Sequence, residues 1–578
     1  MKKTMIVLLL PCLLCCKKKL TNTIGMNLAP TIISFTPTTA ATGTTVTITG
    51  TNFAGTTAVS FGGTAASSFT VVNATTITAV VGAGASGSVS VTSTNGTATL
   101  PGFTYTSTPA ATGIAFGIGG AAGNDYGKDI AVDASGNMVL ASYFYGTVDF
   151  DPAIGINNRV SVGAADVGIS KYNSTGQLQW AVSFGSTGVD IPHSVTTDAS
   201  GNIYVAGYYS GTCDFDPGPG NTTITGTGGT GEAARDGFVA KFNANGIFQW
   251  VKTYANVGTE ENCFGLDADD AGSVYVTGVF QGTVSFDSYT LTSNGVQDIV
   301  LAKLNATNGN TIWAYGLGSA GQDEGSAVEI DKTGNIIFTG YFSQSFDADP
   351  SANTSNLTSA GSFDTYFIKF NAAGNLLGAY KFGGSGADIV APGGIAIDNG
   401  NNIYICGNFT GTSNFGGATK TSNGGQDFFV AKFNNNGAYQ SYISAGGING
   451  DQCHRLAVDV SGNIYITGWF RSTTDFGNSK ILTALASGGG HDIYFAKYSA
   501  TGVCQWVHRA GGSVSGADEL SLGTTVDFLG SDKIVFGGRF QGSDDFDPDP
   551  TSTKTLSSNG MGDIWLGIYN TSNGYLFK

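Results

Sequence analysis

The sequence predicts an all-β protein, in which a β-sandwich is followed by a seven-bladed β-propeller. Three observations lead to this class. Gly supplies 87 of the 578 residues, while only 13 are Pro and 12% are charged. Residues 30–106 contain segments in which apolar and polar residues alternate. From residue 113 onward one sequence unit recurs seven times. Such a chain suits many short strands that are joined by tight turns.

Composition and charge exclude several classes of protein. A hydrophobic fraction of 41% excludes intrinsic disorder, and the lack of a Gly-x-y period excludes collagen. The formal net charge of −16 argues against a nucleic acid as partner, because a phosphate backbone attracts basic proteins. The length favours more than one domain.

The N-terminus reads as an export signal. Lys2 and Lys3 precede an apolar segment from Met5 to Cys16, which is interrupted only by Pro11. A helix of this length is too short for a bilayer core of about 30 Å, so the segment fits a cleaved signal better than a membrane span.

The end of this segment, Leu13-Leu14-Cys15-Cys16, resembles a bacterial lipoprotein signal. The resemblance implies a signal peptide at 1–15, a lipid on Cys16 and a tether at 16–29. Cys15 stands where such signals more often have Gly, Ala or Ser, and it is the alternative lipid acceptor. Signal cleavage without a lipid is the other alternative. The expected location is the bacterial cell envelope, as an outer-membrane or surface lipoprotein.

The remaining cysteines predict neither disulfides nor a zinc site. Their number is odd, their spacing is irregular and no C-x-x-C occurs after the signal. We expect them to be small buried apolar residues. They are Cys213, Cys263, Cys406, Cys453 and Cys504.

Residues 30–106 form the predicted sandwich. Gly43 to Phe53, with the sequence GTTVTITGTNF, alternates with a period of two, as half-buried strands do. Residues 30–106 resemble the IPT/TIG family of immunoglobulin-like domains. The resemblance rests on the segment from Gly43 to Phe53, on the VSFGG that begins at Val59 and on the GTATLPGFTY from Gly96 to Tyr105. The resemblance implies a spacer or interaction module without chemistry of its own. Residues 107–112 are expected to be a linker.

Residues 113–578 contain the repeat. Each unit has an apolar strand that ends at an anchoring Asp, an Asp-x-x-Gly-Asn turn and a returning strand. A Gly-Thr-x-Asp-Phe segment, an Asp-x-x-x-Ala-Lys-Phe strand and an aromatic strand follow. Four strands in each radial unit predict a propeller blade. We expect the turn Asp to stabilise the fold, with similar effects at each copy. The anchors are Asp133, Asp198, Asp269, Asp331, Asp398 and Asp459, and the seventh copy is degenerate near Asp527.

The unit resembles the SBBP β-propeller repeat and, more loosely, NHL propellers. The resemblance rests on the repeated Asp-x-x-Gly-Asn-x-Tyr-Val-x-Gly and the Asp-Phe-Asp-Pro that follows it. Two segments are candidates for the strand that closes the last blade. One is Ile114 to Gly117, and the other is the C-terminal Gly574 to Lys578.

Two repeated groups of charged residues are interpreted as architectural. The Asp-Phe-Asp-Pro segments, such as Asp214 to Pro217, put two carboxylates on one strand face. They are expected to be turns, with a Ca²⁺ site as the alternative. An Asp and a Lys five residues apart, such as Asp236 and Lys241, recur in six units. We expect each Lys to lie over a neighbouring blade, and the repeated tryptophans, such as Trp250, to pack between blades.

His193 and His454 occupy the same place in their units, five residues before the anchoring Asp. This place is predicted to lie just before the first strand of a blade, at the mouth of the channel. The other units have Lys128, Phe264, Ser326 and Gly393 there. Unlike residues at one mouth fit an asymmetric binding site, and they equally fit drift in a loop.

The sequence therefore favours a non-enzymatic binding or adhesion scaffold for a protein or a glycan, expected to be monomeric and without a cofactor. Cys16 is its one assigned site residue. No nucleophile elbow, HExxH or P-loop is present, and six arginines give little support for a sialidase-like cluster. The alternative is a propeller enzyme, a glycoside hydrolase or lyase that acts on extracellular polysaccharide.

Overall fold

The computed structural model describes residues 28–40, 43–82, 86–105, 113–153, 155–227, 235–256, 259–485, 490–510 and 522–578. The expected signal, Cys15, Cys16 and the expected linker lie outside this range. Within it there is no helix, so the all-β prediction is confirmed. Accordingly, no helix of the described part is long and apolar enough to cross a membrane. The chain forms two compact units, Met1–Thr112 and Gly113–Lys578.

The first unit is a sandwich of two sheets. Alternate side chains of its strands point inward, so that Val46, Ile48, Ile77 and Val89 are fully buried in one core. One sheet has the order β1 (Thr31–Thr36), β3 (Thr45–Thr51), β7 (Thr76–Val80), β6 (Ser68–Asn73). The other has the order β2 (Thr39–Ala40), β9 (Gly96–Tyr105), β8 (Gly87–Ser93), β4 (Thr56–Phe61), β5 (Thr64–Ala65).

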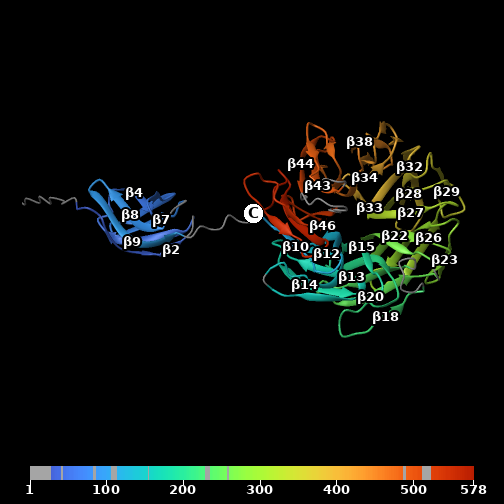
Figure 1. Cartoon of the computed structure of the whole chain (residues 1–578), viewed down its shortest axis with the longest axis horizontal. Helices are drawn as coiled ribbons and strands as arrows, with labels where there is room; N and C mark the ends of the chain where they lie inside the picture. The colour runs from blue at the N-terminus through green and yellow to red at the C-terminus, as the bar shows by residue number, and fades with distance from the viewer. Residues whose placement is uncertain are drawn as a thin grey trace, which may run out of the picture. The chain divides into compact units, whose positions relative to one another are not determined.

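The second unit contains six four-stranded sheets and one six-stranded sheet among its described residues. Figure 1 shows these sheets, called blades below, around a common centre, with first strands such as β15, β27 and β33 inside and last strands such as β14, β20 and β38 outside. Each first strand contacts those of both neighbouring blades, and β45 contacts β11, so the ring is continuous. The first strands are β11 (Tyr126–Val132), β15 (Ile191–Thr197), β21 (Asn262–Ala268), β27 (Asp323–Ile330), β33 (Asp388–Ile397), β39 (Asp451–Val458) and β45 (Leu522–Phe528).

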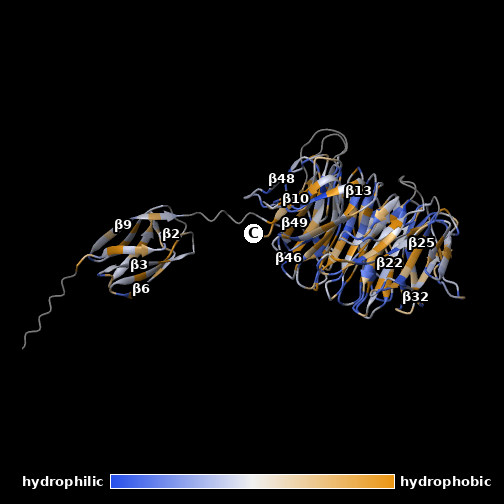
Figure 2. Cartoon of the chain, turned by 90° about the horizontal axis from the view of Figure 1, so that it is seen from below, coloured by the Kyte–Doolittle hydropathy of each residue, from blue (hydrophilic) through white to orange (hydrophobic). Residues whose placement is uncertain are grey.

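The second strands form the buried middle of each blade. Every residue of β16, β34 and β40 is buried, so both faces are covered by neighbouring blades, as expected. Figure 2 shows hydrophobic residues concentrated along the strands of this unit. The second strands are β12 (Met138–Asp149), β16 (Ile203–Tyr209), β22 (Ser273–Phe280), β28 (Ile336–Phe342), β34 (Ile403–Phe409), β40 (Ile464–Phe470) and β46 (Lys533–Phe540).

The outer half of each blade has a third and a fourth strand. The third strands are β13 (Asn158–Tyr172), β19 (Asp236–Phe242), β25 (Asp298–Asn305), β31 (Asp364–Phe370), β37 (Asp427–Phe433), β43 (Asp492–Tyr498) and β49 (Asp563–Asn570). The fourth strands are β14 (Leu178–Phe184), β20 (Phe248–Tyr254), β26 (Thr311–Leu317), β32 (Leu376–Gly384), β38 (Tyr439–Ala445), β44 (Cys504–Ala510) and, in the last blade, β10 (Ala115–Ile118).

Short hairpins extend six of the blades outward and hold the Asp-Phe segments. The β35–β36 hairpin continues from β32, which gives the sheet of six strands. The hairpin strands are β17 (Thr212–Asp214) with β18 (Thr223–Thr225), β23 (Thr283–Phe286) with β24 (Tyr289–Thr292), β29 (Ser345–Asp347) with β30 (Asn356–Thr358), β35 (Thr412–Asn414) with β36 (Thr419–Thr421), β41 (Thr473–Asp475) with β42 (Ile481–Thr483), and β47 (Ser543–Asp545) with β48 (Thr555–Ser557).

The N-terminal strand β10 closes the ring. Ala115 pairs with Gly567 of β49, so the start of the unit supplies the outermost strand of its last blade. The C-terminal segment lies beside it, because Phe577 donates its N–H to Ile568 and accepts one from Ile114. Of the two candidate segments, β10 is therefore the fourth strand, and the C-terminal segment contacts both β49 and the residue before β10.

The Asp-x-x-Gly-Asn turns contain the hydrogen bonds that the sequence predicts. Asp198 accepts N–H bonds from Ser200 at 3.0 Å and Asn202 at 2.9 Å, and its second oxygen accepts the Tyr204 hydroxyl at 2.9 Å. Gly201 has φ of +76°, a conformation that side chains disfavour. Asp133, Asp331, Asp398 and Asp459 make the same two backbone contacts.

The repeated Lys and Trp join neighbouring blades. Lys241 and Trp250 both donate to the carbonyl of Ala306 in the next blade, at 2.7 and 3.1 Å. Lys171 with Trp180, and Lys497 with Trp506, share one carbonyl of the next blade in the same way. These residues have the architectural role that the sequence predicts. The five cysteines from Cys213 to Cys504 are buried free thiols, as expected.

Candidate ligand-binding site at the channel mouth

The first strand of each blade contains a β-bulge near one end of the channel. In β11 the pairing shifts between Gly127 and Asp129, which leaves Lys128 as the extra residue. The same shift makes His193 the extra residue in β15 and His454 the extra residue in β39. The prediction that these histidines precede the first strand is therefore wrong, because each strand begins at least two residues earlier. A bulge redirects the side chain of its extra residue, which is why bulges recur beside functional sites.

Residues from five of these bulges line a cavity of about 380 Å³. Lys128, His193 and His454 line it together, so residues distant in sequence meet at one mouth as expected. Of the other predicted mouth residues, Gly393 lines the deeper part of the channel, whereas Phe264 packs on the ring of His193 at 4.8 Å. Ser326 is buried and donates to Glu324 at 3.1 Å.

Charged groups in the mouth have shifted pKa values. Burial, and then the charge of Arg455, lower the pKa of Lys128 to about 8. Burial also lowers the pKa of His193 well below its usual value, with Lys128, Arg235 and Arg455 acting in the same direction. His193 is thus a neutral imidazole at pH 7. Burial raises the pKa of Glu324 to about 7, although hydrogen bonds from Tyr341 and Ser326 oppose this.

Arg455 separates the mouth from the interior of the channel, since it lines both cavities. Its guanidinium forms an ion pair with Asp129 of β11 at 2.9 Å and donates to the carbonyl of His193 at 3.4 Å. Gly393 makes room for it: a Cβ at this position would lie 2.0 Å from the Cζ of Arg455. Three blades therefore hold this one side chain across the channel.

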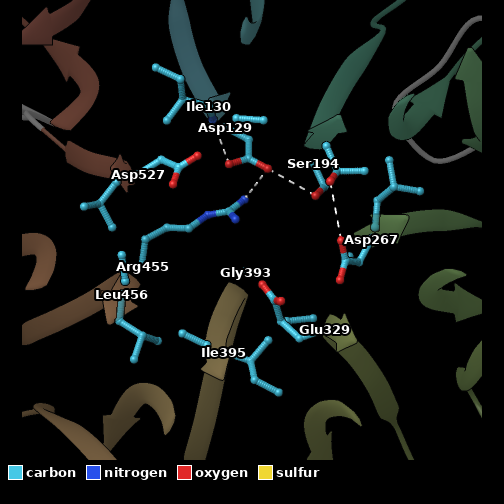
Figure 3. A pocket seen from close by; sticks show the side chains of 18 of the residues that line it. Asp129, Ile130, Ser194, Asp267, Glu329, Gly393, Ile395, Arg455, Leu456 and Asp527 are labelled. Carbon is cyan, nitrogen blue, oxygen red and sulfur yellow. Dashed lines mark hydrogen bonds and ion pairs between the residues drawn. The ribbon is translucent and has the colours of Figure 1, made fainter. Parts of the chain in front are cut away.

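Below Arg455 the channel is acidic. Figure 3 shows Asp129, Asp267, Glu329 and Asp527 around the centre, with Arg455 reaching toward Asp129. They line a cavity of about 280 Å³. Burial raises the pKa of Asp267 and of Asp527 to about 6, and it raises that of Glu329 well above its usual value, with Asp267 and Asp527 adding to the effect.

Three of these carboxylates connect neighbouring blades. Asp129 accepts the N–H of Val195 at 2.8 Å, Asp267 that of Ile330 at 2.9 Å, and Asp527 that of Val132 at 2.7 Å. Each acceptor lies in one blade and each donor in the next. These contacts give the three aspartates a structural role at the inner edge of the ring.

The acidic channel predicts that stability falls as pH rises. A carboxyl whose pKa is raised on folding holds its proton more tightly in the folded chain. The ionised carboxyl therefore destabilises the folded chain. This destabilisation is absent below the pKa of the unfolded chain, about 4, and complete above the pKa of the folded chain. Each unit of difference between the two pKa values changes the free energy of unfolding by about 1.4 kcal/mol. Glu329→Gln should therefore raise the free energy of unfolding at pH 8.5 and change it little at pH 4.5.

Thermal melts of wild type and variant across this pH range measure the effect. Asp270→Asn, which removes the same charge from an exposed turn, is the matched control. An equal gain from both variants at pH 8.5, or a gain from Glu329→Gln that is as large at pH 4.5 as at pH 8.5, would contradict the prediction.

The Asp-Phe-Asp-Pro segments are turns. Asp214 accepts N–H bonds from Asp216 at 3.1 Å and Thr222 at 2.8 Å, and Asp149, Asp347 and Asp545 have equivalent pairs of contacts. The first carboxylate of each segment thus stabilises its loop. Within the described ranges, no group of three or more His, Cys, Asp or Glu residues is arranged to hold a metal ion.

Sequence reasoning missed Arg455 and the acidic residues as site residues. A usable signal was available two residues before each anchoring Asp. Four units have Ala or Thr there, but Asp267 and Glu329 place an acid in an otherwise apolar strand. In the degenerate unit the N–H of Leu529 bonds to Lys533 as that of Asp198 bonds to Asn202, so the anchoring position is Leu529 and the expectation near Asp527 is wrong. Asp527 stands two residues before it and is the third such acid.

Comparison with known proteins supports the assignment of both units. The family model for the IPT/TIG domain matches residues 30–108, and that for the SBBP β-propeller repeat matches residues 179–208. The chain thus contains both modules, and the two predicted resemblances are confirmed. The second match runs through β14, β15 and most of β16.

Two curated proteins are similar over much of the chain. The uncharacterized WD repeat-containing protein L264 of Acanthamoeba polyphaga mimivirus is 26% identical over 464 residues, with 65% of this chain and 32% of that protein covered. The regulatory protein FlaEY of Caulobacter vibrioides is 26% identical over 429 residues, with 68% of this chain and 42% of that protein covered. The chain therefore spans about a third to two fifths of these relatives.

Among solved structures, BamB from Moraxella catarrhalis is 11% identical and has a TM-score of 0.33, with 75% of this chain and 95% of that chain covered. A likeness this weak carries no argument about function.

Proposed function

We propose that this protein is a non-enzymatic scaffold of the bacterial cell envelope, which binds a protein or a glycan at the mouth of its propeller channel. One observation carries the proposal. The turns, the Lys and the Trp recur from blade to blade, whereas the bulge position holds Lys128, His193, Phe264, Ser326, His454 and Thr524 in different blades. Residues that recur have structural roles in the ring. Of the unlike residues, Lys128, His193, His454 and Thr524 meet at the mouth cavity and form a surface able to select a ligand.

The alternative is a propeller enzyme that cleaves extracellular polysaccharide. The raised pKa values of the channel carboxyls favour it, since such shifts are common at catalytic sites. Against it, three of the four acidic residues are engaged in contacts between blades, and Arg455 lies between them and the mouth. Glu329 alone would have to supply both acid and base chemistry there.

Glycan and protein arrays, probed with the chain from residue 17 onward, test the proposal. The variant Gln452→Ala removes a side chain that lines the mouth, and Gln440→Ala removes an exposed Gln of an outer strand as the matched control. We expect a ligand that is lost in the first variant and kept in the second, while both variants keep a cooperative melting transition. Release of shortened products from a polysaccharide would favour the enzyme instead, and binding that both variants retain would place the site elsewhere.

The proposed lipid anchor predicts the fate of Cys16→Ser. Because Cys16 ends an apolar segment too short to span a bilayer, its loss should release the protein from the membrane fraction or stall its processing. Metabolic labelling with a fatty acid measures the attachment directly, and we expect complete loss of label. Cys15→Ser is the matched control and should keep it. Label that survives in Cys16→Ser and disappears in Cys15→Ser would move the lipid to Cys15.

A further inference from the structure

The mouth cavity is short of hydrogen-bond acceptors on one side. Among the described residues, the ammonium of Lys128 has no hydrogen-bond or ion-pair partner. The Nε of Arg455 and the Nδ1 of His193 are buried and also lack a partner. The His193 Nε2 lies 3.2 Å from the amide nitrogen of Asn262, so it accepts that bond and the ring proton sits on Nδ1. Buried donors without partners are rare in folded proteins.

An anion would balance this side of the cavity. Lys128 and Arg455 both line it, and Asp129 neutralises only Arg455. The lowered pKa of Lys128 reflects the same shortage of negative charge, since no carboxylate offsets its burial. A carboxylate bound beside Lys128 would gain a charge-assisted hydrogen bond and relieve the repulsion between the two cations.

The opposite side of the cavity is built differently. Glu324 lies in β27, three blades from Lys128 in a ring of seven. Its carboxyl group accepts a hydrogen bond from the Tyr341 hydroxyl at 2.7 Å. Next to it along the ring, Gln452 donates its side-chain amide to Gln426 at 2.8 Å, and its Oε1 lies 3.1 Å from the Nε2 of His454. Carboxyl and amide groups together offer both donors and acceptors, which is what a ring of hydroxyl groups requires.

The bulge of β33, whose blade lies between those of Glu324 and Gln452, forms an apolar wall on this second side. Val390, Ala391 and Pro392 line the cavity there. The aromatic ring of Tyr126 does not supply such a surface, because Tyr143 stacks on it at 4.8 Å and Arg539 lies over it at 4.7 Å. The volume of about 380 Å³ falls at the lower end of small-molecule sites, which suits one or two sugar rings better than an extended peptide.

We infer that the mouth binds an acidic sugar, a uronic acid residue of a glycan, with its carboxylate at Lys128 and its hydroxyls toward Glu324, Gln426 and Gln452. The CH groups of the sugar ring pack on the wall of β33. This inference rests on the proposed binding function and narrows its ligand class.

Calorimetry with uronic acid trisaccharides and their methyl esters tests the inference. The ester removes the charge and keeps the hydroxyls, so the pair isolates the carboxylate. The panel contains the trisaccharides of galacturonate, glucuronate and mannuronate. Wild type should bind the acid form of at least one of them tenfold or more tightly than its ester. Lys128→Met should abolish this preference and leave the affinity for the ester unchanged. Lys420→Met, on the outer hairpin strand β36, should behave as wild type.

A wild-type affinity that is equal for acid and ester would overturn the inference, as would a preference that survives in Lys128→Met. If Lys128→Met loses its cooperative melting transition, the inference is tested instead by the pH dependence of ligand binding to the wild-type protein. Binding of the acid should weaken as pH rises from 7 to 10, because Lys128 loses its proton, and binding of the ester should not. No pH effect would again overturn the inference.

A peptide that binds through its C-terminal carboxylate, with no uronate bound, would refute the assignment of a sugar as ligand and leave the proposed binding function in place. An array with no ligand at all would refute the binding function itself.

Discussion

A chain that ends before Asp563 should fail to form the propeller at all. This deletion removes β49, which pairs with β46 on one side and with β10 on the other. Both neighbouring strands are left with open edges, and β10 loses the strand it pairs with in the described sheet. Each blade supports the next one through its first strand and its Lys and Trp contacts. We therefore expect loss of the whole ring, with aggregation, and not loss of one blade.

Size-exclusion chromatography and thermal melting of the truncated chain measure this outcome. Deletion of residues 30–106 is the control, because these residues belong to the other compact unit. We expect that protein to stay soluble and to keep the melting transition of the propeller. A monomeric, cooperatively melting protein after the C-terminal deletion would show that the last blade is dispensable.

The turn aspartates should differ in their effect on stability, and not have the similar effects expected from the sequence, because some of them form a buried ion pair and others do not. Asp331 forms an ion pair with Lys369 at 2.8 Å, and the two side chains are 0% and 8% exposed. Asp331→Ala leaves this buried ammonium without its counterion, which typically costs about 3–5 kcal/mol. Asp198 has no such pair, because Lys241 lies over the ring of Tyr204, so Asp198→Ala should cost about 1–2 kcal/mol, as a lost cap does.

Chemical denaturation of both variants compares these losses. The double variant Asp331→Ala/Lys369→Met should recover part of the stability, because it removes the unpaired charge. The ion pair holds the pKa of Asp331 well below its usual range. Its stabilisation is present above the unfolded pKa of about 4 and is lost as pH falls below it. Equal losses at Asp198 and Asp331 would show that the pair contributes nothing.

The sequence was sufficient for the architecture because the repeat encodes local structure. The Asp-x-x-Gly-Asn turn specifies its own hydrogen bonds, and the apolar strands on either side of it can only be buried between neighbours. It was not sufficient for closure, because Ile114 to Gly117 and Gly574 to Lys578 have equally apolar patterns. Only the register of β10 against β49 separates them.

The mouth was located from sequence, but its chemistry was not. The offset of five residues from the anchoring Asp identified His193 and His454, since the same offset leads to the same place in every blade. The bulge that turns these side chains depends on pairing between strands, which the sequence of one strand does not show. Arg455 was missed because its partners, Asp129 and Gly393, lie in distant repeats and meet it only when the ring closes.

The pairing of β10 with β49 also sets the order of events during synthesis. Among the described strands of the propeller, β10 is synthesised first and β49 last. The first strand therefore stays unpaired until the last one has been made. Pairing between such distant segments is slow, because the entropy of loop closure must be overcome before any contact forms. A nascent chain therefore has no means of completing the ring early, and an interrupted product retains open strand edges. These edges distinguish it from the finished protein and offer a direct target to chaperones and proteases.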